Sequence, residues 1–326
     1  MAGNRWRRGS RLLGLLLMAG GALSLAGCGG EPGGVAGPGS AALAGSQVSA
    51  SSSQQGGSDS GSRNVFEPKL HYQRGQAGRG RGGSPLMTWH GGTVLVANTT
   101  TAIFWGSEWS DATFAGDKIT GLDSFFGGYG GSAYADDSTE YSGSNGPVTN
   151  SSSYLGHVFD PGTAPGKALS VSAAVAEVCK MTNDNPDPDG AYFIYTSTGA
   201  GHVNYCAWHS YGTCSNGAPV QVAYMPNIDG ISGCDPVDTW TSHSEGLAAL
   251  ANVTAHELSE MITDPRNGGW YDSQGQENAD KCSWAFHNAV TLADGSVWKL
   301  QMEWSNAAYT AGTGYLNLQG QPGCLQ

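Results

Sequence analysis

The N-terminal quarter of this 326-residue chain contains too little apolar surface to build a hydrophobic core. From residue 29 to about residue 63 the sequence is almost wholly Gly, Ser, Ala, Gln and Pro. Burial of such a segment cannot offset its loss of chain entropy, so we expect a flexible tether that reaches residue 84. Phe66 and Leu70 are the residues of this stretch that are suited to dock on the domain. The folded unit is therefore predicted to span residues 85–326, which is enough chain for one sizeable core or two small lobes.

Residues 1–27 have the organisation of an export signal. Four arginines precede a Leu-rich run at residues 12–25, which is too short and too interrupted by Gly to be a good membrane span. The run closes with the sequence LAGC at Cys28, which resembles the bacterial lipobox, where the cysteine is acylated and becomes the new N-terminus. We expect an exported protein anchored to a membrane of the cell envelope through the lipid on Cys28. The alternative is an ordinary secretory signal with a chance cysteine, which also exports the protein.

The charge of the chain argues against nucleic acid as a partner. Removal of the signal, which holds four arginines and no acidic residue, changes the formal net charge from -12 to -16. Such an acidic surface repels phosphate backbones. Cations, glycans or cell-wall material are the more compatible partners, and charge alone does not choose among them.

The cysteines that follow Cys28 are even in number, and an oxidising compartment favours their pairing into three disulfides. Free buried thiols are the alternative. We expect one specific pair, Cys282 with Cys324, which would tie the end of the chain to the segment after the candidate site. The six residues are Cys179, Cys206, Cys214, Cys234, Cys282 and Cys324.

Strand and helix patterns follow one another through the predicted domain. Strands are predicted from β-branched and aromatic residues and from short apolar runs between turns, at residues 93–97, 101–105, 191–196, 202–208 and 220–224. Apolar periodicity predicts helices at residues 118–126, 168–181 and 244–263. The last helix is the longest, and an Asp-Pro pair at residues 264–265 ends it. The expected fold is α+β, with a central mixed sheet followed by a long helix that carries polar residues in its C-terminal half.

That long helix contains the sequence His-Glu-Leu-Ser-Glu. Because residues four apart lie on one helix face, His256 and Glu260 can converge on one point, while Glu257 is turned one position around the helix. HExxH helices hold zinc in this way, with the first and fifth residues as ligands and the second as the general base. The pattern predicts His256 and Glu260 as metal ligands and Glu257 as a catalytic base.

The remaining ligands have to come from outside the helix, where the following segment is rich in carboxylates. We expect Glu277 as the third ligand and Asp280 as a further ligand or a supporting group. Because the fifth motif residue is Glu rather than His, the plausible divalent ions widen from zinc, which we favour, toward manganese or calcium. The competing interpretation is that the motif residues are ordinary polar residues on a solvated helix face.

Several further motifs in the domain occur in one order from about residue 85 to residue 325. The block from HELSE at residues 256–260 to ADKC at residues 279–282 is the longest, and it resembles the signature of the phosphate-induced protein 1, or EXORDIUM-like, family and its bacterial relatives. This resemblance implies a secreted, cell-wall-associated protein, linked in plants to growth, with no firmly established catalytic activity. It also implies a zincin-like site region and fold. Family members often have a second cysteine shortly before the one matched by Cys206, and its absence here means that disulfide pairings cannot be transferred. The supporting motifs are Trp89-His90-Gly91-Gly92, Phe104-Trp105-Gly106, the segment 205–211, Thr263-Asp264-Pro265, Gly269-Trp270-Tyr271-Asp272, and Gln301 with Trp304-Ser305-Asn306.

Two other groups of residues are candidates for substrate binding. His209 falls at the end of a predicted strand and could face the cleft as a substrate-binding or transition-state group, although a structural role is the commoner one. His90 is a weaker candidate of the same kind. The aromatic residues could form a sugar-stacking platform, although we expect most of them to pack in the core: Trp105, Trp109, Trp270, Tyr271, Trp284 and Trp304.

Three functions from different classes remain open from the sequence. The first is a peptidase-like hydrolase, in which His256, Glu260 and Glu277 hold the ion and Glu257 deprotonates water. The second is a non-catalytic envelope lipoprotein with a structural calcium site. The third is a glycan-binding module that uses the aromatic residues on a cell-wall polymer. Calcium would need several oxygen ligands, and the acidic candidates are Glu260, Asp264, Asp272, Glu277 and Asp280.

Overall fold

A computed structural model describes residues 67–76 and 84–326 of the chain. The expected export signal, the lipidation residue Cys28 and most of the expected tether lie outside the described residues. Within the described part, no helix combines the length and apolar character needed to cross a membrane.

The described domain is built on a six-stranded mixed sheet with the strand order β1-β8-β9-β7-β3-β6. Strands β9, β7, β3 and β6 run parallel to one another, whereas β8 runs antiparallel to both of its neighbours, β1 and β9. The strands are β1 (Lys69–Tyr72), β3 (Asn98–Trp105), β6 (Ser152–Asp160), β7 (Gly190–Thr196), β8 (Tyr205–Thr213) and β9 (Pro219–Met225). The sheet therefore has the mixed character that the sequence predicted.

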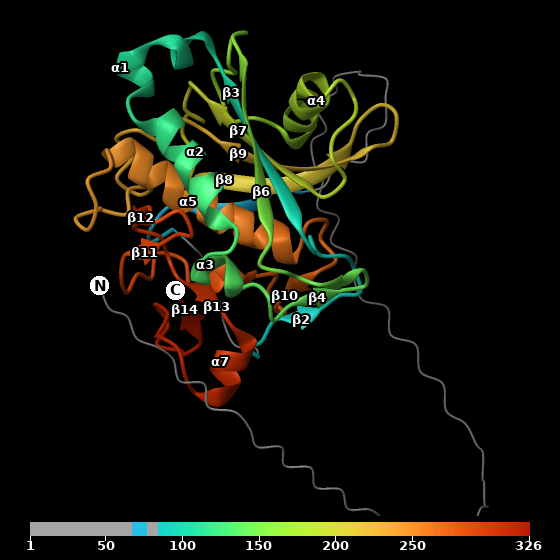
Figure 1. The fold of residues 1–326 in the computed structure, drawn as a ribbon, viewed down its shortest axis with the longest axis vertical. Coiled ribbons are helices and arrows are strands. Elements are labelled where there is room, and N and C mark those ends of the chain that lie inside the picture. Colours follow the sequence, from blue (N-terminus) through green and yellow to red (C-terminus); the bar gives the residue numbers. More distant parts are fainter. Residues whose placement is uncertain (1–66, 77–83) are drawn as a thin grey trace, which may run out of the picture. The chain divides into compact units, whose positions relative to one another are not determined.

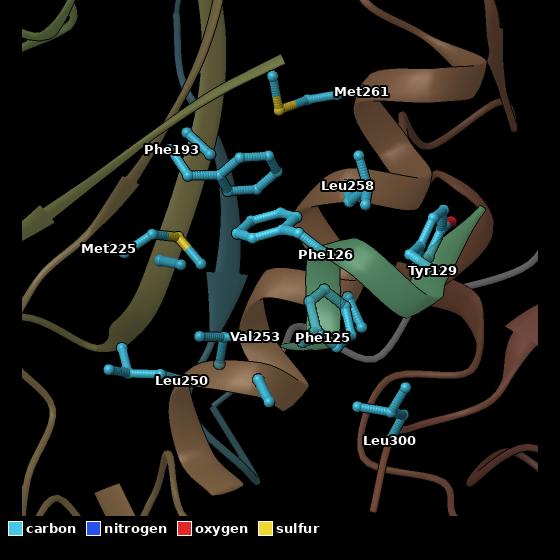
Figure 2. Packing of buried hydrophobic residues seen from close by; sticks show 14 of the residues in the cluster. Phe125, Phe126, Tyr129, Phe193, Met225, Leu250, Val253, Leu258, Met261 and Leu300 are labelled. Carbon is cyan, nitrogen blue, oxygen red and sulfur yellow. The ribbon is translucent and has the colours of Figure 1, made fainter. Parts of the chain in front are cut away.

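Helices cover both faces of this sheet, α4 (Val171–Met181) on one face and α2 (Lys118–Tyr129) with α5 (Glu245–Thr263) on the other (Figure 1). Side chains alternate along β7, so that Phe193 enters the cluster under α2 and α5 while Ile194 enters the cluster under α4. Figure 2 shows Phe126 of α2 packed between the sheet and α5, with its ring centroid 5.0 Å from that of Phe193. The result is a three-layer arrangement, with α2 and α5 in one layer, the sheet in the middle and α4 in the other layer.

Helix α5 begins and ends at residues whose chemistry explains its limits. The hydroxyl of Ser244 accepts a hydrogen bond from Leu247 N at 3.1 Å, as an N-cap does. The helix stops before Pro265, whose ring disfavours the helical conformation of the preceding residue. Every residue from Leu247 to Thr263 is buried, so the interpretation of a solvated polar face is wrong for this helix.

Short elements connected by loops make up the rest of the described chain. The antiparallel pair of β10 with β2 links the segment after α5 to the start of the domain. These elements are β2 (Thr88–Trp89), η1 (Ser107–Ser110), α1 (Ala112–Ala115), α3 (Ala133–Asp136), β4 (Ser142–Gly143), β5 (Gly146–Pro147), β10 (Trp270–Tyr271), α6 (Asn278–Lys281), β11 (Val290–Thr291), β12 (Val297–Trp298), β13 (Glu303–Trp304), α7 (Asn306–Ala311) and β14 (Cys324–Leu325).

All six cysteines of the domain are paired in three disulfides, and the expected bond between Cys282 and Cys324 is one of them. That bond joins the end of α6 to β14, and the other two staple the regions around β8. The other pairs are Cys179 with Cys214 and Cys206 with Cys234.

Two sequence predictions differ from the structure. Residues 93–97 form no strand, because Val94 and Leu95 pack in the core as irregular chain and Leu95 N donates to Ile262 O of α5 at 2.9 Å. Residues 69–72, which were assigned to the tether, are strand β1 at an edge of the central sheet. Leu70, expected to dock on the domain, does so by packing against the α4 side of the sheet.

Candidate metal centre

The polar half of α5 places its motif residues in the protein interior. His256 Nε2 lies 3.1 Å from Glu260 Oε1, one helical turn further on, and both side chains are at most 2 % exposed. Glu257, one position around the helix, points instead toward β8, where its Oε2 atom lies 2.9 Å from His209 Nδ1. The helix therefore presents His256 and Glu260 as one pair and Glu257 as a separate, adjacent group.

The chain reverses after α5 and returns along it. The Asp264 carboxylate accepts hydrogen bonds from Gly268 N at 2.7 Å and Gly269 N at 2.6 Å, which closes the turn. A Cβ atom at residue 269 would lie 2.1 Å from Thr263 O, so the turn requires glycine at this position. This reversal brings α6 back to the motif.

Asp280 of α6 is the returning carboxylate that meets the His256–Glu260 pair. Its backbone N–H donates to Glu260 Oε1 at 3.0 Å, and its Oδ1 atom lies 3.8 Å from His256 Nε2. One ligand-type atom from each of these three residues falls within 4.8 Å of the others. Asp280, expected as an additional ligand or supporting group, thus has the position of a third ligand.

Glu277 lies on the other side of the cluster. Its Oε2 atom is 3.7 Å from His209 Nε2 and 3.8 Å from the ammonium nitrogen of Lys69. Both of its carboxylate oxygens are buried without a hydrogen-bond partner. The structure therefore places Glu277 beside His209, whereas Asp280 has the place beside His256.

His209 joins the two halves of the cluster, and it lies within β8 rather than at the strand end where the sequence placed it. Its Nδ1 atom is 2.9 Å from Glu257 Oε2 and 3.4 Å from Glu260 Oε2. His209, Glu257 and Glu260 form a second set of ligand-type atoms within 4.8 Å, which shares Glu260 with the first. Glu260 is thus the carboxylate common to both sets.

The electrostatics of the cluster are dominated by buried negative charge. Burial, followed by repulsion from Glu260 and Asp280, raises the pKa of Glu257 well above its usual value. Burial and the charge of Glu260 raise the pKa of Asp280 to about 7. Burial also raises the pKa of Glu260, but the opposing attraction of His256, His209 and Lys69 leaves that pKa below its usual value. A further cation among these carboxyls would favour their ionised forms.

Unpaired atoms in the cluster provide an independent test of whether a metal ion fits. Oε1 of Glu257, both oxygens of Glu277 and Nε2 of His209 are buried without a hydrogen-bond partner, and Nε2 of His256 has no partner besides its 3.1 Å ion-pair contact with Glu260 Oε1. Buried polar atoms are normally paired, so several unpaired imidazole and carboxylate atoms facing one another call for a missing partner. Imidazole nitrogen and carboxylate oxygen are ligands that zinc uses. The donor set therefore fits a divalent ion.

Two expected oxygen donors are used elsewhere. Asp264 caps the turn after α5, and Asp272 forms a buried ion pair with Lys281 at 2.9 Å. Neither residue belongs to the ligand-type sets, and Glu277, which the sequence predicted as the third ligand, does not belong to them either, so the oxygen donors in these sets are Glu257, Glu260 and Asp280.

The structure adds contacts that the sequence reasoning missed. Gln301 Nε2 lies 2.7 Å from His256 Nδ1 and donates to Ala279 O at 3.1 Å, which fixes the imidazole ring relative to α6. Gln301 had appeared only as one of the supporting motifs. The ring of His71 lies against that of His256 with 3.7 Å between centroids, and no local pattern in the sequence pointed to it.

The aromatic residues divide between the core and the surface beside the cluster. Trp109, Trp284 and Trp304 are buried, and the half-buried Trp105 and Trp270 pack against the core clusters, which confirms the expected use of most of these side chains in packing. His90, a weak candidate for substrate binding, stacks on Tyr271 with 3.5 Å between ring centroids. The ammonium nitrogen of Lys69 lies 4.9 Å from the Tyr271 ring centroid, so this aromatic pair borders the outer side of the cluster.

Comparison with known proteins identifies no relative. No protein-family model matches the chain, and neither a curated protein nor a solved structure matches it.

Proposed function

We propose that this chain is a metal-dependent, peptidase-like hydrolase in which His256, Glu260 and Asp280 hold a divalent ion and Glu257 is the general base. The observation that carries the proposal is that ligand-type atoms of His256, Glu260 and Asp280 lie within 4.8 Å of one another, beside buried atoms of His209, Glu257 and Glu277 that lack hydrogen-bond partners. The zincin-like fold and the EXORDIUM-like membership are parts of this proposal that rest on the sequence motifs.

Zinc is the ion that this donor set favours. His256 contributes a nitrogen, which suits zinc, whereas calcium takes six to eight oxygen ligands. A bound divalent ion supplies Lewis acidity, which polarises a carbonyl group and activates water at neutral pH. The ring of His256 is held by Gln301, so its Nε2 atom is directed toward Glu260 and Asp280.

The other residues of the cluster have roles that follow from their contacts. Burial raises the pKa of the Glu257 carboxyl well above its usual value, which makes its carboxylate a stronger base toward a proton. His209 holds one oxygen of Glu257 at 2.9 Å, which leaves Oε1 as the atom without a partner. That unpaired oxygen is the atom we assign to proton transfer.

Metal content of the protein purified without chelator is the direct test of the site. We expect about one zinc ion per chain by mass spectrometry in the wild type and a large loss in Glu260→Gln. Glu177→Gln is the matched control, because Glu177 is a buried carboxylate on α4, across the sheet from α5, and pairs with Lys180. The site is excluded if the wild type holds no metal, or if the Glu260 and Glu177 variants retain it equally.

Glu257→Gln tests the catalytic part of the proposal. The variant is expected to retain the metal and to lose hydrolysis of peptide substrates, because the amide cannot accept a proton. Hydrolysis that survives this change in a protein with full metal content contradicts the assignment of Glu257 as base.

A structural metal site is the second candidate, and complete burial favours it. The side chains of His256, Glu257 and Glu277 are fully buried, as in a closed structural centre rather than an open catalytic one. Calcium in place of zinc, together with a melting temperature that falls when the metal is removed and no hydrolysis, would support this candidate over the first.

We also propose that the protein is exported and held at the cell envelope by a lipid on Cys28. The lipobox-like sequence and the three disulfides, which form in oxidising compartments, support this localisation. Cys28→Ser is expected to move the protein from the membrane fraction to the soluble fraction of cells. Equal membrane retention of the variant contradicts lipid anchoring at Cys28.

A further inference from the structure

Strand β1 lies directly over the candidate metal centre. It pairs antiparallel with β8 at the edge of the sheet, with Lys69 opposite His209 and His71 opposite Ala207. Because residues opposite each other in a sheet point to the same face, Lys69 and His71 share with His209 the face that α5 covers. Four residues in an extended strand span about 13 Å, enough to cross the cluster from Glu277 to His256.

The two inward side chains of β1, Lys69 and His71, cover the cluster but form few hydrogen bonds with it. The Lys69 ammonium lies 3.8 Å from Glu277 Oε2 and donates a long hydrogen bond to Gly275 O at 3.4 Å. His71 is 1 % exposed, and neither of its ring nitrogens has a hydrogen-bond partner. An imidazole that is buried and unpaired is an unfavourable occupant of a polar site. Strand β1 therefore covers the ligands with side chains that do not satisfy them.

The attachment of β1 is also uneven along its length. On its C-terminal side, Trp284 Nε1 donates to Tyr72 O at 2.9 Å, Gln73 N donates to Asn204 O at 2.9 Å, and Arg74 N donates to Gly233 O at 2.8 Å. Residue 67, on the N-terminal side, is exposed. The C-terminal end of β1 thus has backbone bonds beyond its pairing with β8, whereas Lys69 is held by that pairing and by its side-chain contacts with Gly275 and Glu277.

We propose that the outer edge of β8 is a docking site for an extended peptide, and that residues 69–72 are an intramolecular occupant of that site. An extended peptide can add to an exposed strand edge through its backbone groups, with alternate side chains directed into pockets. At this edge the alternate side chains point at the candidate centre, as Lys69 does toward Glu277 and His71 toward His256. The substrate class is thus an unfolded or extended polypeptide, and β1 blocks its entry. The consequence for hydrolysis rests on the proposed function, whereas peptide binding does not.

Leu70→Pro in the full chain opens the proposed site, and binding of a fluorescent peptide reports it. Proline removes a backbone N–H and disfavours pairing in a strand. The probe is a labelled peptide with the sequence of residues 67–74, measured by fluorescence anisotropy in the presence of chelator. A tethered competitor at millimolar effective concentration weakens binding to the wild type, so we expect the variant to bind at least about tenfold more tightly.

Leu155→Pro is the matched control, because Leu155 is an exposed residue of β6, the strand at the opposite edge of the same sheet. This variant is expected to bind the peptide like the wild type. Equal binding by Leu70→Pro and the wild type overturns the proposal if the variant retains its fold by circular dichroism. If Leu70→Pro does not fold, Lys69→Glu decides, because it repels β1 from Glu277 without removing a backbone donor. A folded Lys69→Glu variant without a gain in binding overturns the proposal equally.

The chelator separates this test from that of the metal centre. Tighter peptide binding in a protein that holds no metal supports the docking site and contradicts the hydrolase. A protein with one zinc ion per chain and no gain in peptide binding supports the metal centre and contradicts the docking site.

Discussion

Loss of the disulfide between Cys282 and Cys324 is expected to weaken metal binding as well as stability. Cys282 directly follows α6, the helix that carries Asp280, and the bond ties this helix to β14. The sequence separation of 42 residues corresponds to about 4 kcal/mol of stabilisation from the lost entropy of the unfolded chain. Asp280 would then be positioned mainly by its backbone hydrogen bond to Glu260.

The disulfide between Cys179 and Cys214 provides a control of nearly equal strength. Its separation of 35 residues also corresponds to about 4 kcal/mol, and it joins α4 to the end of β8, on the face of the sheet away from α5. Ser replacements of both cysteines in each pair should therefore lower the free energy of unfolding by similar amounts, measured by urea denaturation. Only the Cys282–Cys324 variant should lose zinc affinity, by about tenfold or more in a chelator competition.

The outcome of this comparison can contradict the assignment of Asp280. If both double variants lose zinc equally, the effect is one of general stability and not of α6 position. If the Cys282–Cys324 variant is destabilised as expected but binds zinc like the wild type, α6 does not need this disulfide to present a ligand.

Three further predictions concern the turn, the helix cap and the pH dependence of stability. Gly269→Ala should lower the free energy of unfolding by roughly 1–3 kcal/mol in urea denaturation and reduce metal content, because the new Cβ would lie 2.1 Å from Thr263 O. Gly166→Ala is the control and should leave both quantities unchanged, because a Cβ there meets open space. Ser244→Ala removes the N-cap of α5 and should lower the free energy of unfolding by about 1 kcal/mol with metal content unchanged, because His256 lies three turns further along the helix. Burial, then repulsion from neighbouring carboxylates, raises the pKa of Asp137 from 3.8 to about 7. Because the unfolded chain loses this proton at lower pH than the folded chain, the free energy of unfolding falls as pH rises between those two values. The slope is at most about 1.4 kcal/mol per pH unit. Asp137→Asn should remove that part of the slope in urea denaturation curves recorded at pH 4.5 and pH 7.5, and an unchanged slope would contradict the assignment.

The main elements of the fold could be predicted because their signals are local. Apolar periodicity located α2, α4 and α5, and β-branched or alternating runs located parts of β3, β7, β8 and β9. The candidate site followed from the same kind of signal, since the i, i+4 spacing joins His256 to Glu260 and Pro265 forces the chain to turn back. Asp280 could be placed near the motif because only a short segment separates it from that turn.

The contacts that could not be predicted are those between distant segments. β1 has only four residues, too few for their polar–apolar alternation to predict a strand, and its pairing with β8, more than 130 residues away, makes it one. The strand predicted at residues 93–97 was wrong because this β-branched run has no partner strand. Its backbone forms a hydrogen bond to the end of α5 instead. The sequence could not predict that Asp280, rather than Glu277, lies beside His256. Their positions are set by α6, a single turn whose orientation depends on tertiary contacts.

The proposed docking site leads an extended substrate to the candidate centre through the edge of the sheet that β1 occupies. His256 and Glu277 are fully buried, whereas the side chains of Asp280 and Lys69 are each one quarter exposed, and Lys69 belongs to β1. A hydrolase with this arrangement must release β1 before an extended substrate can reach Glu257. The double variant Leu70→Pro with Glu257→Gln should therefore bind the peptide as tightly as Leu70→Pro alone and leave it uncleaved. Tight binding without turnover in that protein would connect the docking edge to the catalytic base, and cleavage by it would separate them.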